Sequence, residues 1–229
     1  MTPAITGISS MATRQLLADL VADYQRAGGG RVAIESVGGV DAARRVKAGE
    51  AFDFVILASN AIEQLIAAER VVAGSAVGIV LSGVAVAVRA GDARPDVGSE
   101  AALRRAVQAT RSLSCSTGPS GVHLAGLFER WGIAAEVAGK FVQAPPGVPV
   151  GSLVARGEVE LGFQQLSELI HLPGIDVIGP LPPEVQIITT FTGGLIAGSE
   201  HAEAVMSFFD FINSEASAAV KRRHGMEPA

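Results

Sequence analysis

The sequence predicts an α/β fold with two lobes, each a mixed sheet flanked by helices, joined by two crossing strands. The chain of 229 residues is long enough for two lobes, each of about 100 residues. Short apolar strands alternate with amphipathic helices, which is the pattern of βαβ units. The composition is 48% hydrophobic and only 18% charged, which favours sheets that are buried on both faces.

The first third of the chain repeats one unit: a short apolar strand, a turn of small residues and an amphipathic helix. Leu16, Leu20 and Tyr24 recur at helical spacing, and the glycines that follow them end the first helix. Ser59 or Asn60 is suited to cap the third helix. The pattern predicts strands at 5–8, 32–37 and 54–57, each followed by a helix.

An uncharged stretch of 18 residues runs from Val71 to Val88, close to the shortest length of a membrane-spanning helix. Gly and Ser residues interrupt it, and most of the remainder is Val, Ile and Ala. We therefore expect two short buried strands joined by a turn, and no membrane insertion.

The second lobe begins where an apolar strand, Val84 to Val88, leads into a polar, turn-rich stretch instead of a helix. Ser99 is expected to cap the next helix, and a later helix is expected to open at Gly121. The extended stretch 185–197 is interpreted as the return crossing. These crossings predict lobe 1 at 1–83 plus 191–229 and lobe 2 at 84–190. Within lobe 2 we expect strands at 113–115, 141–143, 161–163 and 177–178, a short helix ending at Arg156 and another at 165–170.

The charge pattern excludes several partners and chemistries. The formal net charge is -5 and no stretch gathers the basic residues into a stripe, so nucleic acid is not an expected partner. The four histidines lie far apart and there is no phosphate-binding or dinucleotide-binding glycine motif, so we expect no metal and no cofactor. The single cysteine, Cys115, is expected to be a buried strand thiol.

The first residues, Met1 to Ile5, lack the basic and apolar regions of a signal peptide. The sequence as written therefore predicts a cytoplasmic protein, or a periplasmic one if it begins after cleavage.

Four turns at the start of expected helices consist of small residues, hydroxyls and glycines with no cation. Free N–H groups at a helix start, together with the helix dipole, favour a bound anion. Serine caps and glycine turns are also common without any ligand, so both interpretations stay open. The turns are Ser9–Thr13, Gly38–Asp41, Gly118–Gly121 and Gly147–Val150.

In this order along the chain, several segments resemble the periplasmic molybdate-binding proteins of ABC importers. The resemblance implies a type II periplasmic-binding fold that closes over a small oxyanion, with neutral groups as donors and an importer membrane subunit as a possible partner. The segments are Ser9–Thr13, Ala43–Gly49, Phe52–Ile56, Gly121–Leu124 and Leu161–Phe163.

The resemblance also implies which residues bind the ligand, in a cleft between the lobes. Glycines here replace serines of the family's second binding segment, and Gln164 stands where the family has a tyrosine, which suits an organic carboxylate. The implied ligand-binding residues are Ser9, Ser10, Met11, Ala12, Gly39, Val40, Ser120, Gly121, Val150 and Gln164.

The same family is similar to bacterial aconitate isomerases, which move a double bond in a tricarboxylate. This alternative needs a base that removes a proton next to a carboxylate. His123, near a helix start, and Asp41 are the candidates, although Asp41 also suits a helix cap. Arg44, Arg45 and Arg89 are candidates for pairing with ligand carboxylates, or are solvated surface cations.

Overall fold

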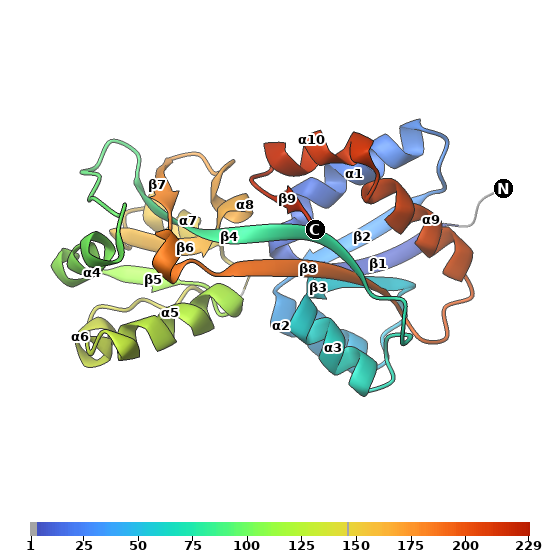
Figure 1. The fold of residues 1–229 in the computed structure, drawn as a ribbon, viewed down its shortest axis with the longest axis horizontal. Helices are drawn as coiled ribbons and strands as arrows, with labels where there is room; N and C mark the ends of the chain where they lie inside the picture. The colour runs from blue at the N-terminus through green and yellow to red at the C-terminus, as the bar shows by residue number, and fades with distance from the viewer. Residues whose placement is uncertain (1–3, 146) are drawn as a thin grey trace. The chain divides into compact units, whose positions relative to one another are not determined.

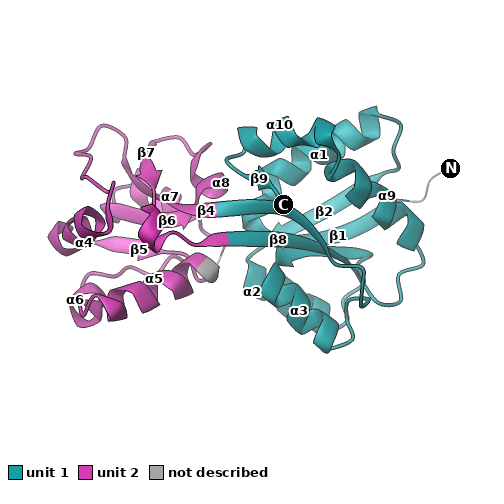
Figure 2. Cartoon of the chain, in the orientation of Figure 1, with its two compact units in different colours: residues 1–82, 189–229 teal, residues 83–188 magenta. Residues whose placement is uncertain are grey.

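A computed structural model describes residues 4–145 and 147–229, with the side chain of Pro119 left out. The chain divides into two compact units (Figure 2). Unit 1 consists of the residues up to Ser82 together with Thr189–Ala229, and unit 2 consists of Gly83–Ile188. Met1 to Pro3, which entered the signal-peptide prediction, lie outside the described residues.

The sheet of unit 1 has the strand order β2-β1-β3-β8-β4. β1 pairs in parallel with β2 and β3, whereas β8 pairs antiparallel with β3, so the sheet is mixed as predicted. The strands are β1 (Ile5–Ser10), β2 (Val32–Val37), β3 (Phe54–Ala58) and β8 (Ile188–Leu195).

Helices cover both faces of this sheet, because alternate strand residues point to opposite faces. Phe54 and Ile56 pack in one core cluster with α1, α9 and the C-terminal segment, and Val55 and Leu57 pack in another with α2 and α3 (Figure 1). A 3-10 turn, η1 (Met11–Thr13), joins β1 to α1. The helices are α1 (Arg14–Arg26), α2 (Gly39–Lys47), α3 (Ser59–Ala67), α9 (Ala202–Ile212) and α10 (Glu215–Arg223).

The expected pair of short strands within Val71 to Val88 is wrong, because the chain forms one strand of 13 residues, β4 (Val77–Arg89). The glycines of this strand are explained by close contacts with other segments of the chain, and not by a turn. A Cβ at Gly78 would lie 3.1 Å from Ala229, and one at Gly83 would lie 3.3 Å from the Gln186 side chain. β4 belongs to both units, and in unit 1 it pairs with β9 (Glu227–Pro228), a strand that sequence reasoning missed.

Unit 2 also has a mixed sheet. β5 (Leu113–Cys115) pairs in parallel with β6 (Leu161–Gln165), and β4 pairs antiparallel with both β6 and β7 (Ile175–Pro180). The predicted two-lobed α/β class is therefore confirmed. The helices of this unit are α4 (Glu100–Ala109), α5 (Pro119–Arg130), α6 (Ala134–Ala138), α7 (Val150–Ala155) and α8 (Leu166–Leu169), and η2 (Pro183–Val185) is a 3-10 turn.

Several predicted boundaries in unit 2 differ from the structure. α5 begins at Pro119 and not at Gly121, since proline is well suited to the first turn of a helix. Gln165 belongs to β6, so the helix expected from 165 begins at Leu166. The strand expected at 141–143 is reduced to one isolated bridge, Leu113 to Phe141. The predicted Ser99 cap is confirmed, because its Oγ accepts from the Ala102 N–H at 3.2 Å.

Candidate functional site

In unit 1 the carboxyl ends of three parallel strands meet at one edge of the sheet. Ser9 lies opposite both Ser36 of β2 and Ile56 of β3, and each of these strands runs directly into a helix or helical turn. Free N–H groups of the helix starts therefore gather at the same edge as the strand-end hydroxyls. We call Ser10, Met11, Gly39 and Val40 the unit 1 seat.

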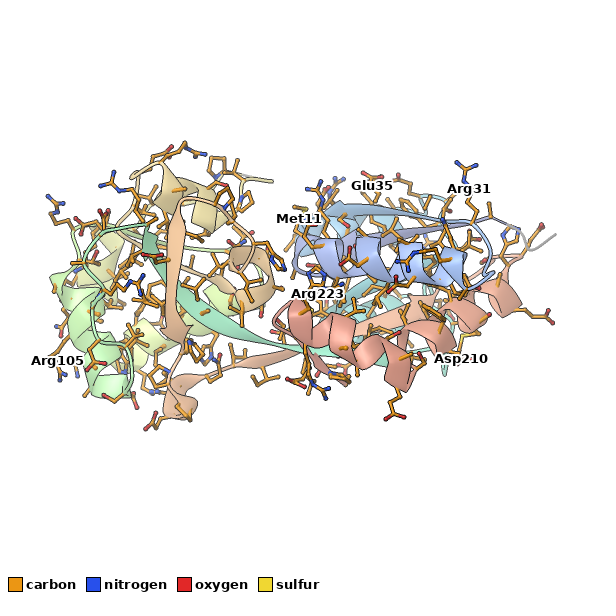
Figure 3. All side chains as sticks on the ribbon, turned by 90° about the horizontal axis from the view of Figure 1, so that it is seen from above. Met11, Arg31, Glu35, Arg105, Asp210 and Arg223 are labelled. Atoms are coloured by element: carbon orange, nitrogen blue, oxygen red, sulfur yellow. The ribbon has the colours of Figure 1, made fainter. Side chains whose placement is uncertain are left out.

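Ser10 organises this seat as the N-cap of η1. Its Oγ accepts from the Ala12 N–H at 3.3 Å, and its carbonyl accepts from the Thr13 hydroxyl at 3.0 Å. Met11 follows at the N-terminal end of this helical segment (Figure 3). The amide of Ala12, one of the predicted ligand donors, is thus engaged within the turn.

Ser9 has a different position from Ser10. It is fully buried, and its Oγ lies 2.8 Å from the Oγ of Ser36 on the neighbouring strand. A buried hydroxyl with such a partner links β1 to β2. The structure therefore gives Ser9 a cross-strand contact behind the seat.

The start of α2 adjoins Ser10. A Cβ at Gly39 would lie 3.8 Å from the Oγ of Ser10, so the two segments are neighbours. Gly38 occupies the N-cap position without a side-chain hydrogen bond, which leaves the first N–H groups of α2 without a side-chain cap. Val40 is 69% exposed at this helix start.

The arginines predicted as candidate ligand contacts are already paired with carboxylates of the chain. Asp41, in the first turn of α2, forms an ion pair with Arg44. Arg45 binds both Glu35 and Glu50, and in unit 2 Arg89 pairs with Asp92 at 3.0 Å. All three arginines are therefore engaged by carboxylates of their own unit, and Arg45 has only 19% of its side chain exposed.

A second pair of hydroxyls in unit 1 was not predicted. Ser59 does not cap α3 with its side chain, because Ala58 holds the cap position. Its Oγ donates to the Thr190 carbonyl at 3.1 Å and lies 2.7 Å from the Oγ1 of Thr192. β8 reaches β3 from far along the sequence, so no local pattern identifies this pair.

Unit 2 repeats the arrangement with other donors. Cys115 lies opposite Phe163, so Ser116 and Gln164 follow at the same end of the parallel pair β5 and β6. The Oγ atoms of Ser116 and Ser120 are 2.7 Å apart. We call Ser116, Ser120, Gly121, Val150 and Gln164 the unit 2 seat.

Glycine is required at position 121, because the backbone of another part of the chain lies very close to it. A Cβ at this position would lie 1.7 Å from the Ser116 carbonyl oxygen, far inside a van der Waals contact. Its N–H donates to the Gly118 carbonyl at 3.0 Å, which tightens the first turn of α5. The N-cap, Gly118, makes no side-chain hydrogen bond.

Gln164 is only 4% exposed and connects two elements of the unit 2 seat. Its Oε1 accepts from the Gly151 N–H in the first turn of α7 at 3.4 Å, and its Nε2 donates to Oε1 of Glu168 at 2.8 Å. Pro149 leaves the start of α7 without a side-chain cap, so Val150 presents an N–H that the helix does not use.

Glu168 is a residue that sequence reasoning missed. It is half-buried on α8, and burial raises its pKa to about 7 against the smaller opposing effect of the Gln164 hydrogen bond. The neighbouring Ser167 hydroxyl is buried without a hydrogen-bond partner among the described residues. A single glutamate in a short polar segment carries no sequence signal of this kind, because the effect comes from packing.

The two predicted bases have unlike environments. The Nε2 atom of His123 lies 2.8 Å from the Val185 carbonyl oxygen, and a carbonyl only accepts, so this nitrogen carries the proton. In the neutral ring Nδ1 then has the free lone pair. Asp41 instead has a carboxylate that is bound to Arg44 and 46% exposed.

Cys115 is buried as predicted, and burial raises the pKa of its thiol to about 12. Among residues 4–145 and 147–229, no three His, Cys, Asp or Glu side chains come together as a metal site, and no helix is long and apolar enough to cross a membrane. One surface cavity of about 470 Å³ lies between α1 and β2 and is lined by residues such as Arg14, Val21 and Glu35, none of which was predicted to bind ligand.

Comparisons with known proteins identify relatives of the whole chain. The aconitate isomerase of Pseudomonas sp is 32% identical over 230 residues, covering 98% of this chain and 87% of that protein. The periplasmic molybdate-binding protein of Azotobacter vinelandii superposes with a TM-score of 0.81 at 16% identity, covering 98% of this chain and 99% of that one. AgtB of A. tumefaciens R10, in complex with agropinic acid, superposes with a TM-score of 0.76 at 14% identity, covering 100% and 83%.

The two structural neighbours establish the fold, which is the two-lobed fold of periplasmic binding proteins. The model of one protein family matches residues 5–227, nearly the whole chain. The chain therefore belongs to the bacterial extracellular solute-binding proteins.

Proposed function

We propose that this solute-binding protein captures a small oxyanion or organic carboxylate through neutral donors. The observation that carries the proposal is the uncapped start of α2 beside the Ser10 hydroxyl. Arg44 and Arg45 of α2 are occupied by carboxylates of the same chain. Backbone N–H groups and hydroxyls at a helix start bind anions without a cation.

The composition of the two seats favours an organic carboxylate over a tetrahedral metal oxyanion. Gly39 and Val40 stand at the start of α2, and Gln164 supplies an amide in the unit 2 seat. The relative with 32% identity carries the name of an enzyme that acts on a tricarboxylic acid, and the structure of AgtB contains an organic acid.

A thermal-shift panel of molybdate, tungstate, sulfate, citrate and the two aconitates tests this function. An anion at 100 times its Kd adds about 2.7 kcal/mol to the free energy of unfolding, a rise in Tm of roughly 5–10 °C for a chain of this length. We expect the largest rise with a tricarboxylate. A rise with molybdate alone would limit the site to inorganic oxyanions, and no rise with any of them would refute the proposal.

The family membership supports a role outside the cytoplasm. We propose that this chain acts in the periplasm and delivers its ligand to the membrane subunit of an ABC importer; its family and its periplasmic structural neighbour support this role. Fractionation of cells that produce the protein from its own gene tests the location, and co-purification with an importer subunit tests the partner. Recovery only in the cytoplasm would contradict this role.

A second candidate, isomerisation of an unsaturated tricarboxylate, is favoured by the relative that matches 98% of the chain. A base must take a proton from the carbon next to a carboxylate and a proton must return at another carbon. Nδ1 of His123 is available for this, and Asp41 is the alternative base.

Proton NMR of cis-aconitate mixed with the protein measures any conversion to the trans isomer. We expect turnover to disappear in His123→Ala if the ring is the base, and in Asp41→Asn if the carboxylate is. Full activity in both variants would exclude both residues, and the absence of conversion by the unmodified protein would leave solute binding alone.

A further inference from the structure

Glu168 differs from the other shifted carboxyl groups of the described residues. The others, among them Asp19, Glu35, Asp53, Glu100 and Asp176, have a pKa below the ordinary value, because hydrogen bonds from donors together outweigh the opposing effect of burial. The pKa of Glu168 alone is raised, to about 7, because burial is not offset by a cation.

The elements packed against Glu168 explain the missing counter-charge. α8 contacts β6 and β7, and Gln164 connects it to α7. β6 and α7 contain no ionisable side chain. On β7 the carboxylate of Asp176 is taken up by Arg94 and the Gly91 N–H. His171 follows shortly after α8, and it makes no direct contact with the Glu168 carboxyl.

The hydrogen bonds fix where a proton resides on this carboxyl. Oε1 accepts from Nε2 of Gln164 at 2.8 Å, so the protonated form carries its O–H on Oε2. Gln164 in turn accepts the Gly151 N–H near the start of α7. The Gln164 side chain therefore lies between the Glu168 carboxyl and the start of α7. The O–H on Oε2 has no acceptor among the described residues and is free to donate.

We propose that Glu168 binds the anionic ligand in its carboxylic acid form, donating the Oε2 hydroxyl to a carboxylate or oxyanion oxygen, so that the protein takes up a proton as the ligand binds at neutral pH. The proposal rests on the anion-binding function above. An ionised carboxylate beside an anion is repulsive, whereas a protonated one is a strong donor, so the bound anion holds the proton in place.

This coupling sets the direction of the pH dependence. Above pH 7 the free protein holds Glu168 mostly ionised, and each further pH unit lowers the apparent affinity by up to about tenfold. Below about pH 6 Glu168 is already protonated in the free protein, so its titration no longer changes the affinity. The ligand is then an acceptor-rich anion, fully ionised near pH 7.

Isothermal titration of cis-aconitate and of molybdate at pH 7.5, in buffers with different ionisation enthalpies, measures the proton uptake. We expect about 0.8 proton per bound anion for a group with a pKa of about 7. Glu168→Gln keeps the donor but not the titration, so it should bind with a flat pH profile and no uptake from this position. Any proton exchanged by the probe itself is common to both proteins and cancels in the comparison.

Two further variants complete the test. Glu168→Leu removes the donor and should weaken binding at every pH. Glu158→Gln, at a carboxylate that is ion-paired with Arg156 on the surface, should leave the uptake unchanged. Binding without a difference in uptake between the unmodified protein and Glu168→Gln would overturn the role of Glu168 alone. A protein that binds neither probe nor any other anion of the panel would overturn the anion-binding function itself.

Discussion

The two seats share one construction and differ in their donors. In unit 1, parallel strands end beside the uncapped start of α2, with hydroxyls and backbone N–H groups as the donors. In unit 2, parallel strands end beside the uncapped start of α5, but a side-chain amide and a carboxyl lie close by. We infer from this difference that anion binding would be independent of pH at the unit 1 seat and dependent on pH at the unit 2 seat.

The largest expected effect is at the unit 1 seat, in Ser10→Leu. Leucine removes the hydroxyl that caps η1 and adds bulk beside Gly39, so affinity for the anion should fall by more than roughly 100-fold at every pH. Calorimetric titration measures this, with Ser10→Ala as the smaller change that keeps the space open. Unchanged affinity in a folded Ser10→Leu protein would remove Ser10 from the site.

The next effect is on the stability of unit 2, in Gly121→Ala. The new Cβ would meet the Ser116 carbonyl, so the free energy of unfolding should fall by roughly 2–3 kcal/mol as the first turn of α5 shifts. Denaturant unfolding measures the loss. Gly126→Ala on the same helix is the matched control, because nothing lies within 4 Å of its Cβ, and it should gain up to about 1 kcal/mol. Equal stability of the two variants would contradict the close approach at Gly121.

A smaller effect is expected for the stability of Glu168→Gln in the absence of ligand, and only towards the alkaline end of the pH range. The pKa of Glu168 is raised from 4.5 to about 7, so between these values the folded state binds more protons than the unfolded state. The unmodified protein therefore loses stability as pH rises through this window, by roughly 1–3 kcal/mol in total, and the glutamine variant does not lose this part.

Thermal unfolding from pH 5 to pH 8.5 measures this difference. The Tm of Glu168→Gln relative to the unmodified protein should rise with pH and level off above about pH 8. A constant difference would mean that the carboxyl titrates normally in the folded state.

The smallest effect is expected for Arg44→Gln. The ion pair of Arg44 with Asp41 is exposed on α2, so its loss should change the free energy of unfolding by less than about 1 kcal/mol and the anion affinity by less than about twofold. Denaturant unfolding and calorimetric titration measure the two quantities. A loss of affinity of tenfold or more would make Arg44 a ligand contact and would contradict the proposal that the unit 1 seat binds the anion through neutral donors alone.

Local patterns were sufficient for the fold class and for most of unit 1. Each strand up to Ala58 is followed by a helix with its own apolar face, so the order of elements could be predicted from spacing alone. β4 was misread because Gly78 and Gly83 are typical of turns in isolation. Their reason for being small lies in Ala229 and Gln186, more than 100 residues away.

For the candidate site, the sequence predicted which turns could bind an anion, but not which groups in those turns are already engaged within the chain. The Ala12 amide is engaged by Ser10, and Ser9 is committed to Ser36. These are consequences of strand register and cap geometry. Glu168 was not predictable, because its pKa depends on the absence of a cation from elements that only the packed structure brings together.

The division of unit 1 into two chain segments has a consequence for folding during synthesis. Unit 2 is continuous from Gly83 to Ile188, so all its strands and helices are present before β8 is translated. Unit 1 needs β8, α9, α10 and finally β9, whose Pro228 pairs with Val80 across almost 150 residues. The sequence of unit 2 is therefore complete before that of unit 1, although unit 1 begins first, and β1 to β3 must wait for β8 before their sheet is complete.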